Sequence, residues 1–356
     1  MEVQKRCSGC GIMHNVSEFG KQKLSNDGIS FACRVCINER SAQYRKTMAG
    51  HLHALYNQAK RNANDRRNKN REEAGKFEIE FSDLENLYKK QKGLCYYSGI
   101  QMNIERNDYK MSLERLNPDL GYIKENIAFV CSELNSISQW SLEKIQEMLF
   151  ILQQEITDNP ANFEVNTEKR IEQKVVYSTV DGVEYAQCTW CNENKTRDSF
   201  GKIVNIGCYD CCKIKRKNKL NSPRGTLQQL LDGAKKHTKR REGTQITTRD
   251  NSFDIDLNEL IKKYNEQKGL CYYSGLPLNF GSYLETDWKV SLERLDVFKG
   301  YTKDNICLIC LEFQASDKSV ILKDNTLGNS GWTKEKFQYF LTKVQEKYAN
   351  ENNTEV

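Results

Sequence analysis

The sequence lacks any apolar run approaching the roughly 18 residues that a membrane-spanning helix needs. The residues before Cys7 also lack the apolar stretch of a secretory signal peptide. Charged residues make up 29% of the 356 residues and hydrophobic residues 38%. We therefore expect a soluble protein with no membrane partner, in a reducing compartment such as the cytoplasm or the nucleus, and not a secreted protein.

Fourteen cysteines in such a compartment indicate metal binding rather than disulfides. Thiolates on two tight turns can close a tetrahedral zinc shell, which replaces a hydrophobic core too small to hold itself. Two sets of paired Cys-x-x-Cys motifs are candidates for such shells: Cys7, Cys10, Cys33 and Cys36, and Cys188, Cys191, Cys208 and Cys211. Cys212 is one ligand too many, and the spacing of the first set favours Cys211. We expect two structural Zn²⁺ ions, with Phe19 and Phe200 as apolar plugs; unliganded or redox-active thiols are the alternative.

A stretch of nine residues, Gln-Lys-Gly-Leu-Cys-Tyr-Tyr-Ser-Gly, occurs at residues 91–99 and returns unchanged at residues 267–275. The agreement continues downstream, where Ser-Leu-Glu-Arg-Leu stands at residues 112–116 and again at 291–295. Gly-Tyr, Asn-Ile, a cysteine and a closing tryptophan follow in the same order in both halves. The sequence therefore predicts a tandem duplication, and 356 residues leave room for two or more domains with cores of their own.

The predicted fold class is α+β, with two tandem units that each contain a zinc ribbon, a basic helical segment and a strand, loop, strand, helix core with a closing helix. A polar stretch with Pro160 and no clear period reads as a linker between them. The expected boundaries are residues 1–45 for the first ribbon, 46–157 for the first helical segment and core, 158–174 for the linker, 175–220 for the second ribbon and 221–356 for the second helical segment and core.

Local patterns predict the elements in more detail. Few helix breakers occur in residues 41–73, which predicts one long helix. Ser82 and Glu85 have the spacing of a capping box before a helix that reaches Lys90. The other expected elements are a short strand over residues 77–81, strands near 111–116 and 127–131, helical structure from residue 132, a helix over 141–156, and a hairpin with Asp181-Gly182 at its turn.

The net charge of +6 is modest for this length, but the basic residues are concentrated in the helical segments. Next to a zinc knuckle, such a concentration favours contact with nucleic-acid phosphates, whereas a solvated helix face is the alternative. The candidate nucleic-acid contacts are Arg61, Arg66, Arg67 and Lys69 in the first half and Lys215, Arg216, Lys217, Lys235, Lys236, Arg240 and Arg241 in the second.

The block from Ser112-Leu-Glu-Arg through Gly121-Tyr122 and Asn126 to Asn135 resembles the HNH, or His-Me finger (ββα-metal), endonucleases. The resemblance is to the phage and large-DNA-virus type that places a four-cysteine ribbon before the core, and it covers most of both halves. It implies a viral source, and it adds a virion to the expected locations. It also implies that Glu114 and Asn135 hold one divalent cation, Mg²⁺ or Mn²⁺, and that Asn126 braces the loop.

One position departs from the family pattern. The family uses a histidine as general base, and Arg115 stands there in the first half and Arg294 in the second. Arginine stays protonated, so it could only clamp a phosphate. None of the four histidines falls inside either core block. A substitute base is Tyr122, if its pKa is strongly lowered, or metal-bound water acting alone.

The second half carries Glu293 and Asn305 at the matching positions, but Gln314 stands where Asn135 stood. Glutamine is a longer and weaker metal ligand, so the first unit is the better candidate for cleavage. Glu114 with Arg115 has an alternative reading as an ion pair at a strand edge, and Asn126 with Asn305 as turn residues.

Several members of the superfamily carry a second zinc where this chain has Cys95, Cys131, Cys271 and Cys310. Ser98 and Ser274 break the Cys-x-x-Cys pairs there, so we expect buried thiols instead. The paired tyrosines of the nine-residue repeat are expected in the core, with base stacking as the alternative. These tyrosines are Tyr96, Tyr97, Tyr272 and Tyr273.

Two functions remain open on the sequence alone. The first is a metal-dependent DNA endonuclease in which one chain acts as a pseudo-dimer on a duplex. The second is a nuclease scaffold that has lost its base and acts as a DNA-binding or DNA-organising protein, alone or inside a larger nucleoprotein assembly. RNA stays an alternative partner, because zinc ribbons and basic helices also bind RNA.

Overall fold

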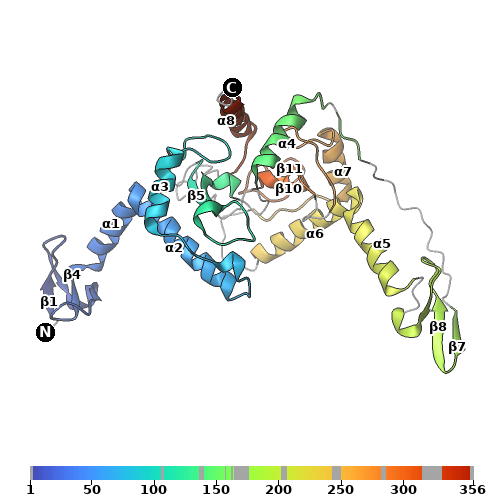
Figure 1. Ribbon diagram of the computed structural model, residues 1–356, viewed down its shortest axis with the longest axis horizontal. Helices are drawn as coiled ribbons and strands as arrows, with labels where there is room; N and C mark the ends of the chain where they lie inside the picture. Colours follow the sequence, from blue (N-terminus) through green and yellow to red (C-terminus); the bar gives the residue numbers. More distant parts are fainter. Residues whose placement is uncertain are drawn as a thin grey trace. The chain divides into compact units, whose positions relative to one another are not determined.

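The computed structural model describes residues 3–105, 108–135, 140–156, 158–161, 163, 176–201, 207–242, 250–281, 286–314 and 331–352. Its elements are of mixed α+β type, with short strands in small sheets between helices (Figure 1). The chain divides into two compact units. Unit 1 holds the described residues up to Leu142 and those from Tyr339 onward, and unit 2 holds the rest. Within the described ranges, no helix is both long and apolar enough to cross a membrane.

The first ribbon is built from two short antiparallel pairs. Strand β1 (Gln4–Arg6) pairs with β2 (Met13–Asn15), and β3 (Phe19–Lys21) pairs with β4 (Ile29–Cys33). A 3₁₀ turn, η1 (Val16–Glu18), joins the two pairs. Its buried cluster consists only of Cys7, Phe19, Ala32 and Cys33. So small a cluster buries too little apolar surface to hold a fold without a further source of stability.

The second ribbon has one three-stranded sheet of β7 (Tyr177–Val180), β8 (Val183–Gln187) and β9 (Asn194–Thr196). The predicted hairpin is confirmed: Asp181 and Gly182 form its turn with positive φ angles of 52° and 77°. The short 3₁₀ turn η5 (Arg197–Ser199) follows β9. The buried cluster is again small, and Phe200 lies in it as Phe19 does in the first ribbon.

Each ribbon leads into two successive helices rather than one. These helices are α1 (Arg34–Arg45) and α2 (Met48–Arg67) in the first half, and α5 (Tyr209–Asn221) and α6 (Pro223–Glu242) in the second. The single helix predicted over residues 41–73 is therefore wrong. The Thr47 hydroxyl accepts the Gly50 N–H at 3.1 Å and donates to the Tyr44 carbonyl at 2.7 Å, which ends one helix and caps the next.

A glycine is required at this helix joint. A Cβ on Gly50 would lie 1.9 Å from the Tyr44 carbonyl oxygen. The second half has the same joint, because the Ser222 hydroxyl accepts the Gly225 N–H and donates to the Lys219 carbonyl. The backbone approaches too closely there for any side chain.

Helix α3 (Phe81–Gln91) begins two residues earlier than the capping box predicted at Ser82 places it. Glu80 is the cap, and its N–H donates to the Asp83 carboxylate at 2.8 Å; Ser82 lies inside the helix. The reason is packing, since the Phe81 ring stacks on His53 with centroids 3.7 Å apart. The short strand predicted over residues 77–81 is reduced to one bridge between Phe77 and Tyr122. The turn η2 (Glu73–Gly75) precedes it, and the counterpart of α3 in the second half is α7 (Leu257–Glu266).

An antiparallel hairpin forms the centre of each unit. Strand β5 (Met111–Arg115) pairs with β6 (Ile127–Cys131), and β10 (Val290–Arg294) pairs with β11 (Ile306–Cys310). The second strand of each hairpin is buried along its whole length. The turn η3 (Lys124–Asn126) leads into β6.

The nine repeated residues attach to these hairpins. The Gln91 side chain donates to the Phe129 carbonyl at 2.9 Å and accepts the Phe129 N–H at 2.8 Å, so it pairs with the backbone of β6 as a further strand would. Gln267 makes the same two bonds with Leu308 of β11. The Lys-Gly step that follows has positive φ in both copies. The repeat therefore has a structural role at the edge of each hairpin.

Helical structure from residue 132 was predicted, but each hairpin is followed by a single 3₁₀ turn, η4 (Ser132–Leu134) or η6 (Leu311–Phe313). Residues 136–139 lie outside the described part. The later helices are α4 (Leu142–Gln153), close to the prediction, and α8 (Lys334–Asn352).

Each closing helix belongs mainly to the other unit, and not to the unit whose hairpin precedes it in the chain. From Glu143 on, α4 belongs to unit 2, although it follows the hairpin of unit 1 in the chain. The Lys144 ammonium lies 2.7 Å from Glu312 and 2.5 Å from Asp287 of unit 2. From Tyr339 on, α8 belongs to unit 1, where Lys347 donates to the Tyr96 carbonyl at 2.6 Å.

The start of the predicted linker is anchored to unit 2. Asn159 donates its N–H to the Lys268 carbonyl at 2.8 Å, and its carbonyl accepts the Tyr264 hydroxyl at 2.6 Å. The Phe163 ring packs edge-on against Tyr264. The remaining predicted linker residues, 162 and 164–174, lie outside the described part of the chain.

Candidate metal centres and hairpin sites

The structure brings each predicted set of ribbon cysteines together. In both sets the four Sγ atoms lie within 4.8 Å of one another. Tetrahedral zinc with Zn–S bonds of about 2.3 Å would hold its thiolates roughly 3.8 Å apart, so only a small contraction is needed. Cys211 completes the second set, whereas Cys212 points its thiol at the Gly207 carbonyl. Both sets can hold a metal ion such as zinc.

Backbone N–H groups point at the first sulfur of each set. Cys7 Sγ accepts the Cys33 N–H at 3.2 Å and the Gly9 N–H at 3.3 Å. The N–H groups of Cys33 and Cys10 lower the pKa of Cys7 to about 6. Burial acts to raise the pKa of Cys188, but the N–H groups around it outweigh burial and bring it to about 6. The N–H groups therefore favour the thiolate, the form that binds metal, at the first sulfur of each set. The pKa of the last cysteine in each set is raised to about 12, chiefly by a neighbouring thiol in the first set and by burial in the second.

In unit 1, Asn126 holds the loop between β5 and β6. It is buried, and its Oδ1 accepts the Asn117 N–H at 2.8 Å. Its Nδ2 donates to the carbonyls of Asn117 and Gly121 at 3.0 and 2.9 Å. Asn305 makes the same three bonds in unit 2, with Asp296 and Gly300. Asn126 and Asn305 are therefore both turn residues and the residues that hold the loop, so the two interpretations agree.

Arg115 also binds the backbone of the loop between β5 and β6. Its Nη1 donates to the carbonyls of Pro118 and Leu120, both at 2.7 Å. Arg294 does the same to Val297 and Lys299, both at 3.0 Å. One nitrogen of each guanidinium therefore binds two loop carbonyls, which gives Arg115 and Arg294 a structural role in their loops.

Glu114 and Asn135 share a face of the first hairpin. Asn135 lies at the end of η4, and its Nδ2 donates to the Ser112 hydroxyl at 2.7 Å and to the Leu113 carbonyl at 3.2 Å. Ser112 and Glu114 are two residues apart on β5, so their side chains point to the same side. Glu114 is largely buried, and its carboxylate accepts the Arg115 N–H at 2.9 Å.

The second hairpin repeats this face with a longer amide. The Gln314 side chain accepts the Ser291 hydroxyl and donates to the Leu292 carbonyl at 3.1 Å. Glu293 lies two residues after Ser291 on β10 and accepts the Arg294 N–H at 2.9 Å. The extra methylene of glutamine is therefore accommodated without loss of these anchors.

Tyr122, the substitute base considered above, is buried and lies under two guanidinium groups. The Cζ atoms of Arg66 and Arg115 lie 5.8 and 5.7 Å from its ring centroid. In unit 2, Arg294 lies 5.1 Å from the Tyr301 ring.

The cysteines of the nine-residue repeat are buried thiols, as expected. Cys95 Sγ accepts the Cys131 N–H at 3.3 Å, and Cys271 Sγ accepts the Cys310 N–H at the same distance. Burial acts to raise the pKa of Cys95, but hydrogen bonds with Cys131 and Ser98 lower it to about 6. Among the described residues, only the two ribbon sets form clusters of metal-ligand type.

The tyrosines beside these cysteines differ in burial. Tyr97 is buried, whereas Tyr96, Tyr272 and Tyr273 are half-buried. Cys307 faces Glu293 across the second hairpin, and burial followed by that carboxylate raises its pKa.

The basic candidates lie mostly in solvent. Arg66 is half-buried, and every other candidate with a described side chain is exposed. The side chain of Arg241 lies outside the described part. Helices α1 and α5 contain no fully buried residue, and their half-buried Cys36 and Cys211 pack against the ribbon clusters.

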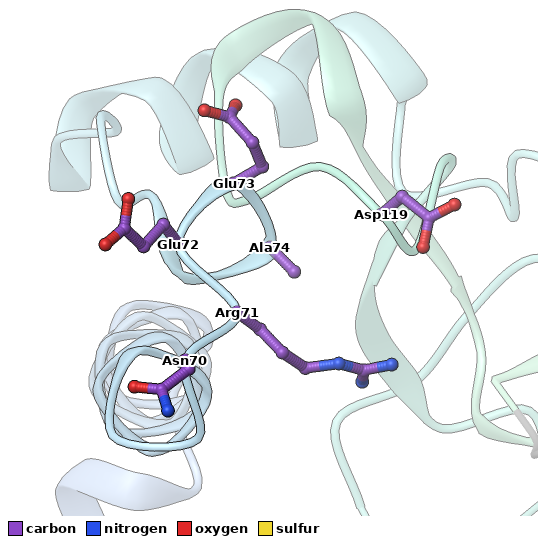
Figure 2. A pocket seen from close by; sticks show the side chains of 6 residues that line it. All are labelled: Asn70, Arg71, Glu72, Glu73, Ala74 and Asp119. Carbon is purple, nitrogen blue, oxygen red and sulfur yellow. The ribbon is translucent and has the colours of Figure 1, made fainter.

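A depression of about 420 Å³ lies beside the loop between β5 and β6 in unit 1 (Figure 2). Arg71 extends along it, and Asp119 lies at its far side. Glu72 and Glu73 also belong to its lining, but their carboxylates point away from it.

Sequence reasoning missed two sets of contacts. Gln91 and Gln267 lie inside the unchanged repeat, and that invariance was the available signal. Lys144 is buried in unit 2 with Glu312, and a lysine on an otherwise apolar helix face was the signal there. Comparison of the chain with protein-family models, with curated proteins and with solved structures finds no match.

Proposed function

We propose that the protein is a metal-dependent, HNH-like DNA endonuclease made of two tandemly duplicated units, each with a zinc-containing ribbon that contributes to DNA binding. The observation that carries the proposal is the hairpin face in unit 1, where Glu114 lies on the same side of β5 as Ser112, the anchor of Asn135. Carboxylate and amide oxygens are the ligands that Mg²⁺ and Mn²⁺ prefer. Such an ion would neutralise charge on the phosphate under attack.

The surrounding residues support this role. Asn126 fixes the loop beside the site through three hydrogen bonds. The exposed basic side chains of α2, α5 and α6 supply positive charge that suits a phosphate backbone. Neither arginine at the histidine position can accept a proton, so a metal held by Glu114 and Asn135 would have to activate the attacking water, with Tyr122 as the alternative base.

The proposal is tested by incubating the full chain with supercoiled plasmid and Mg²⁺ or Mn²⁺. Glu114→Ala is expected to abolish nicking, and Glu293→Ala to have a smaller effect because Gln314 is the weaker ligand. Glu125→Ala removes an exposed carboxylate from the neighbouring η3 turn and serves as the control. Linear product that needs both glutamates would mean two working sites.

A second function is favoured by one observation. Arg115 and Arg294 both use a nitrogen to hold the loop, which gives them a structural reason to occupy the base position. On this reading the chain is an HNH-derived, zinc-containing DNA-binding or DNA-organising protein without activity. Salt-sensitive DNA binding with no cleavage under either metal would select it.

A further inference from the structure

One arginine of unit 1 has a buried nitrogen that lacks an acceptor. Arg66 lies in the last turn of α2, and its Nη1 is buried with no hydrogen-bond partner among the residues that the structure describes. A guanidinium N–H group that has lost water without gaining an acceptor is costly, and more so than a neutral donor. A further acceptor, beyond the described residues, would therefore stabilise this group.

A second guanidinium faces the same place. Arg66 and Arg115 both lie over the Tyr122 ring, with Cζ atoms 5.8 and 5.7 Å from its centroid. Burial lowers the pKa of Arg115, and the charge of Arg66 lowers it further, so the two cations repel each other. The Glu114 carboxylate attracts Arg115 and also accepts its backbone N–H.

We propose that Arg66 and Arg115, held over Tyr122, form a binding site for a phosphate-type oxyanion. An oxyanion accepts several N–H groups at once, so it satisfies the buried Nη1 and removes the repulsion between the cations. The Tyr122 ring closes one side and keeps both guanidinium planes in position. If the proposed function holds, the ligand is a phosphate of the DNA backbone; that assignment rests on the proposed function, whereas the anion site itself does not.

Among the described residues, both arginines of the proposed anion site are seen only in unit 1. Arg294 lies over Tyr301 in the same way as Arg115 lies over Tyr122. Aligning Gly225 with Gly50 matches Arg66 with Arg241, whose side chain lies outside the described residues.

The test uses the full chain and inorganic phosphate, with binding followed by NMR of the arginine Nε–H groups. The wild type is expected to show saturable binding, and Arg66→Gln to weaken it roughly 10-fold or more, the loss typical of a charge-assisted hydrogen bond. Arg66→Lys keeps the positive charge but lacks the paired N–H groups of the guanidinium, so its affinity for phosphate is expected to lie between those of the wild type and Arg66→Gln. The matched control is Arg67→Gln, which removes the same charge one residue along, where the guanidinium is exposed and bonded to Asn64.

Phosphate binding that is not saturable, or that falls equally in Arg66→Gln and Arg67→Gln, would overturn the anion site and leave the endonuclease proposal standing. Thermal unfolding of each variant is measured alongside; if Arg66→Gln is unfolded, Arg66→Lys against Arg67→Lys decides. A duplex-DNA titration separates the two proposals. Phosphate binding lost in Arg66→Gln, in a chain that does not bind DNA, would support the site while removing its DNA assignment.

Discussion

The cysteine turns of the ribbons and those of the hairpins share one hydrogen bond but differ in what surrounds it. In the first ribbon the Cys33 N–H donates to the Cys7 sulfur at 3.2 Å, and in the first hairpin the Cys131 N–H donates to the Cys95 sulfur at 3.3 Å. The ribbon turn belongs to a set of four thiols, whereas the hairpin turn has Ser98 where a further thiol would stand.

The difference follows the amount of apolar surface nearby. The buried cluster of the first ribbon has only two side chains besides its thiols, Phe19 and Ala32. The hairpin of unit 1 buries Met111, Phe129, Leu134 and Trp140. Each such side chain contributes about 1.5–3 kcal/mol when fully buried. We therefore expect the ribbons, where apolar burial is scarce, to need a metal ion, and the hairpin turn to be stable without one.

The largest expected difference between the ribbon turn and the hairpin turn is the effect of replacing one of their cysteines. Cys33→Ser is expected to unfold the first ribbon and to release one metal ion per chain, because structural zinc supplies on the order of 10–16 kcal/mol of folding free energy in small zinc domains. Cys95→Ser should cost only about 1–3 kcal/mol and release none, since it leaves a buried turn that still packs. Metal analysis and limited proteolysis of both variants test this.

Less than one zinc ion per chain after gentle purification would contradict the assignment of the ribbon cysteines as zinc ligands. So would a Cys95→Ser variant that loses metal, because Cys95 and Cys131 would then belong to a metal site.

The buried ion pair of unit 2 should show the next largest effect, and it shows how a hairpin unit is stabilised without metal. Burial acts to lower the pKa of Lys144, but Glu312 and Asp287 outweigh it and raise it. Lys144→Met would leave Glu312 buried and unpaired, at a cost of about 3–5 kcal/mol. Urea unfolding followed by tryptophan fluorescence measures the change.

Two controls define that effect. Lys303→Met breaks an exposed pair with Glu259 and should cost at most about 1 kcal/mol. The double variant Lys144→Met with Glu312→Gln should recover much of the loss; equal destabilisation by the single and double variants would show that packing, and not charge, is lost.

The loop asparagines provide a comparison between the two hairpins themselves. Asn126→Ala removes three hydrogen bonds from the loop, although the Asn117 and Gly121 carbonyls keep backbone N–H donors, and should cost roughly 2–3 kcal/mol. Asn305→Ala should cost the same, because its bonds match in partners and length. Clearly unequal losses, measured by urea unfolding, would mean that the loops are braced differently despite their matching geometry.

Local sequence patterns predicted the parts of the structure that depend on few residues. Cysteine spacing gave both four-thiol sets, and Asp181-Gly182 gave the hairpin because a tight turn needs positive φ at both positions. The break at Thr47 was missed, since the pattern of apolar residues continues through it and only the close approach at Gly50 reveals it.

Contacts between distant segments were beyond such patterns. The apolar helix face around Lys144 signals in the sequence that the residue is unusual, but its partner Glu312 is known only once α4 lies in unit 2. Arg66 was one of several basic residues on α2, and its difference from Arg67 exists only once Tyr122 is folded beneath it. Separation along the chain hides such pairings until the fold is known.

The smallest expected effect concerns acid. His51 is buried in unit 1 and lies 3.0 Å from the Met111 carbonyl, and burial lowers its pKa below 6.5. The unfolded chain then takes up a proton more readily than the folded chain as the pH falls below 6.5, so unit 1 loses stability between that pH and the lowered pKa. The matching position in unit 2 is Thr226, which does not titrate. His51→Thr should therefore flatten the pH dependence of unit 1 in urea unfolding at pH 7 and pH 5, and an unchanged slope would show that another group is responsible.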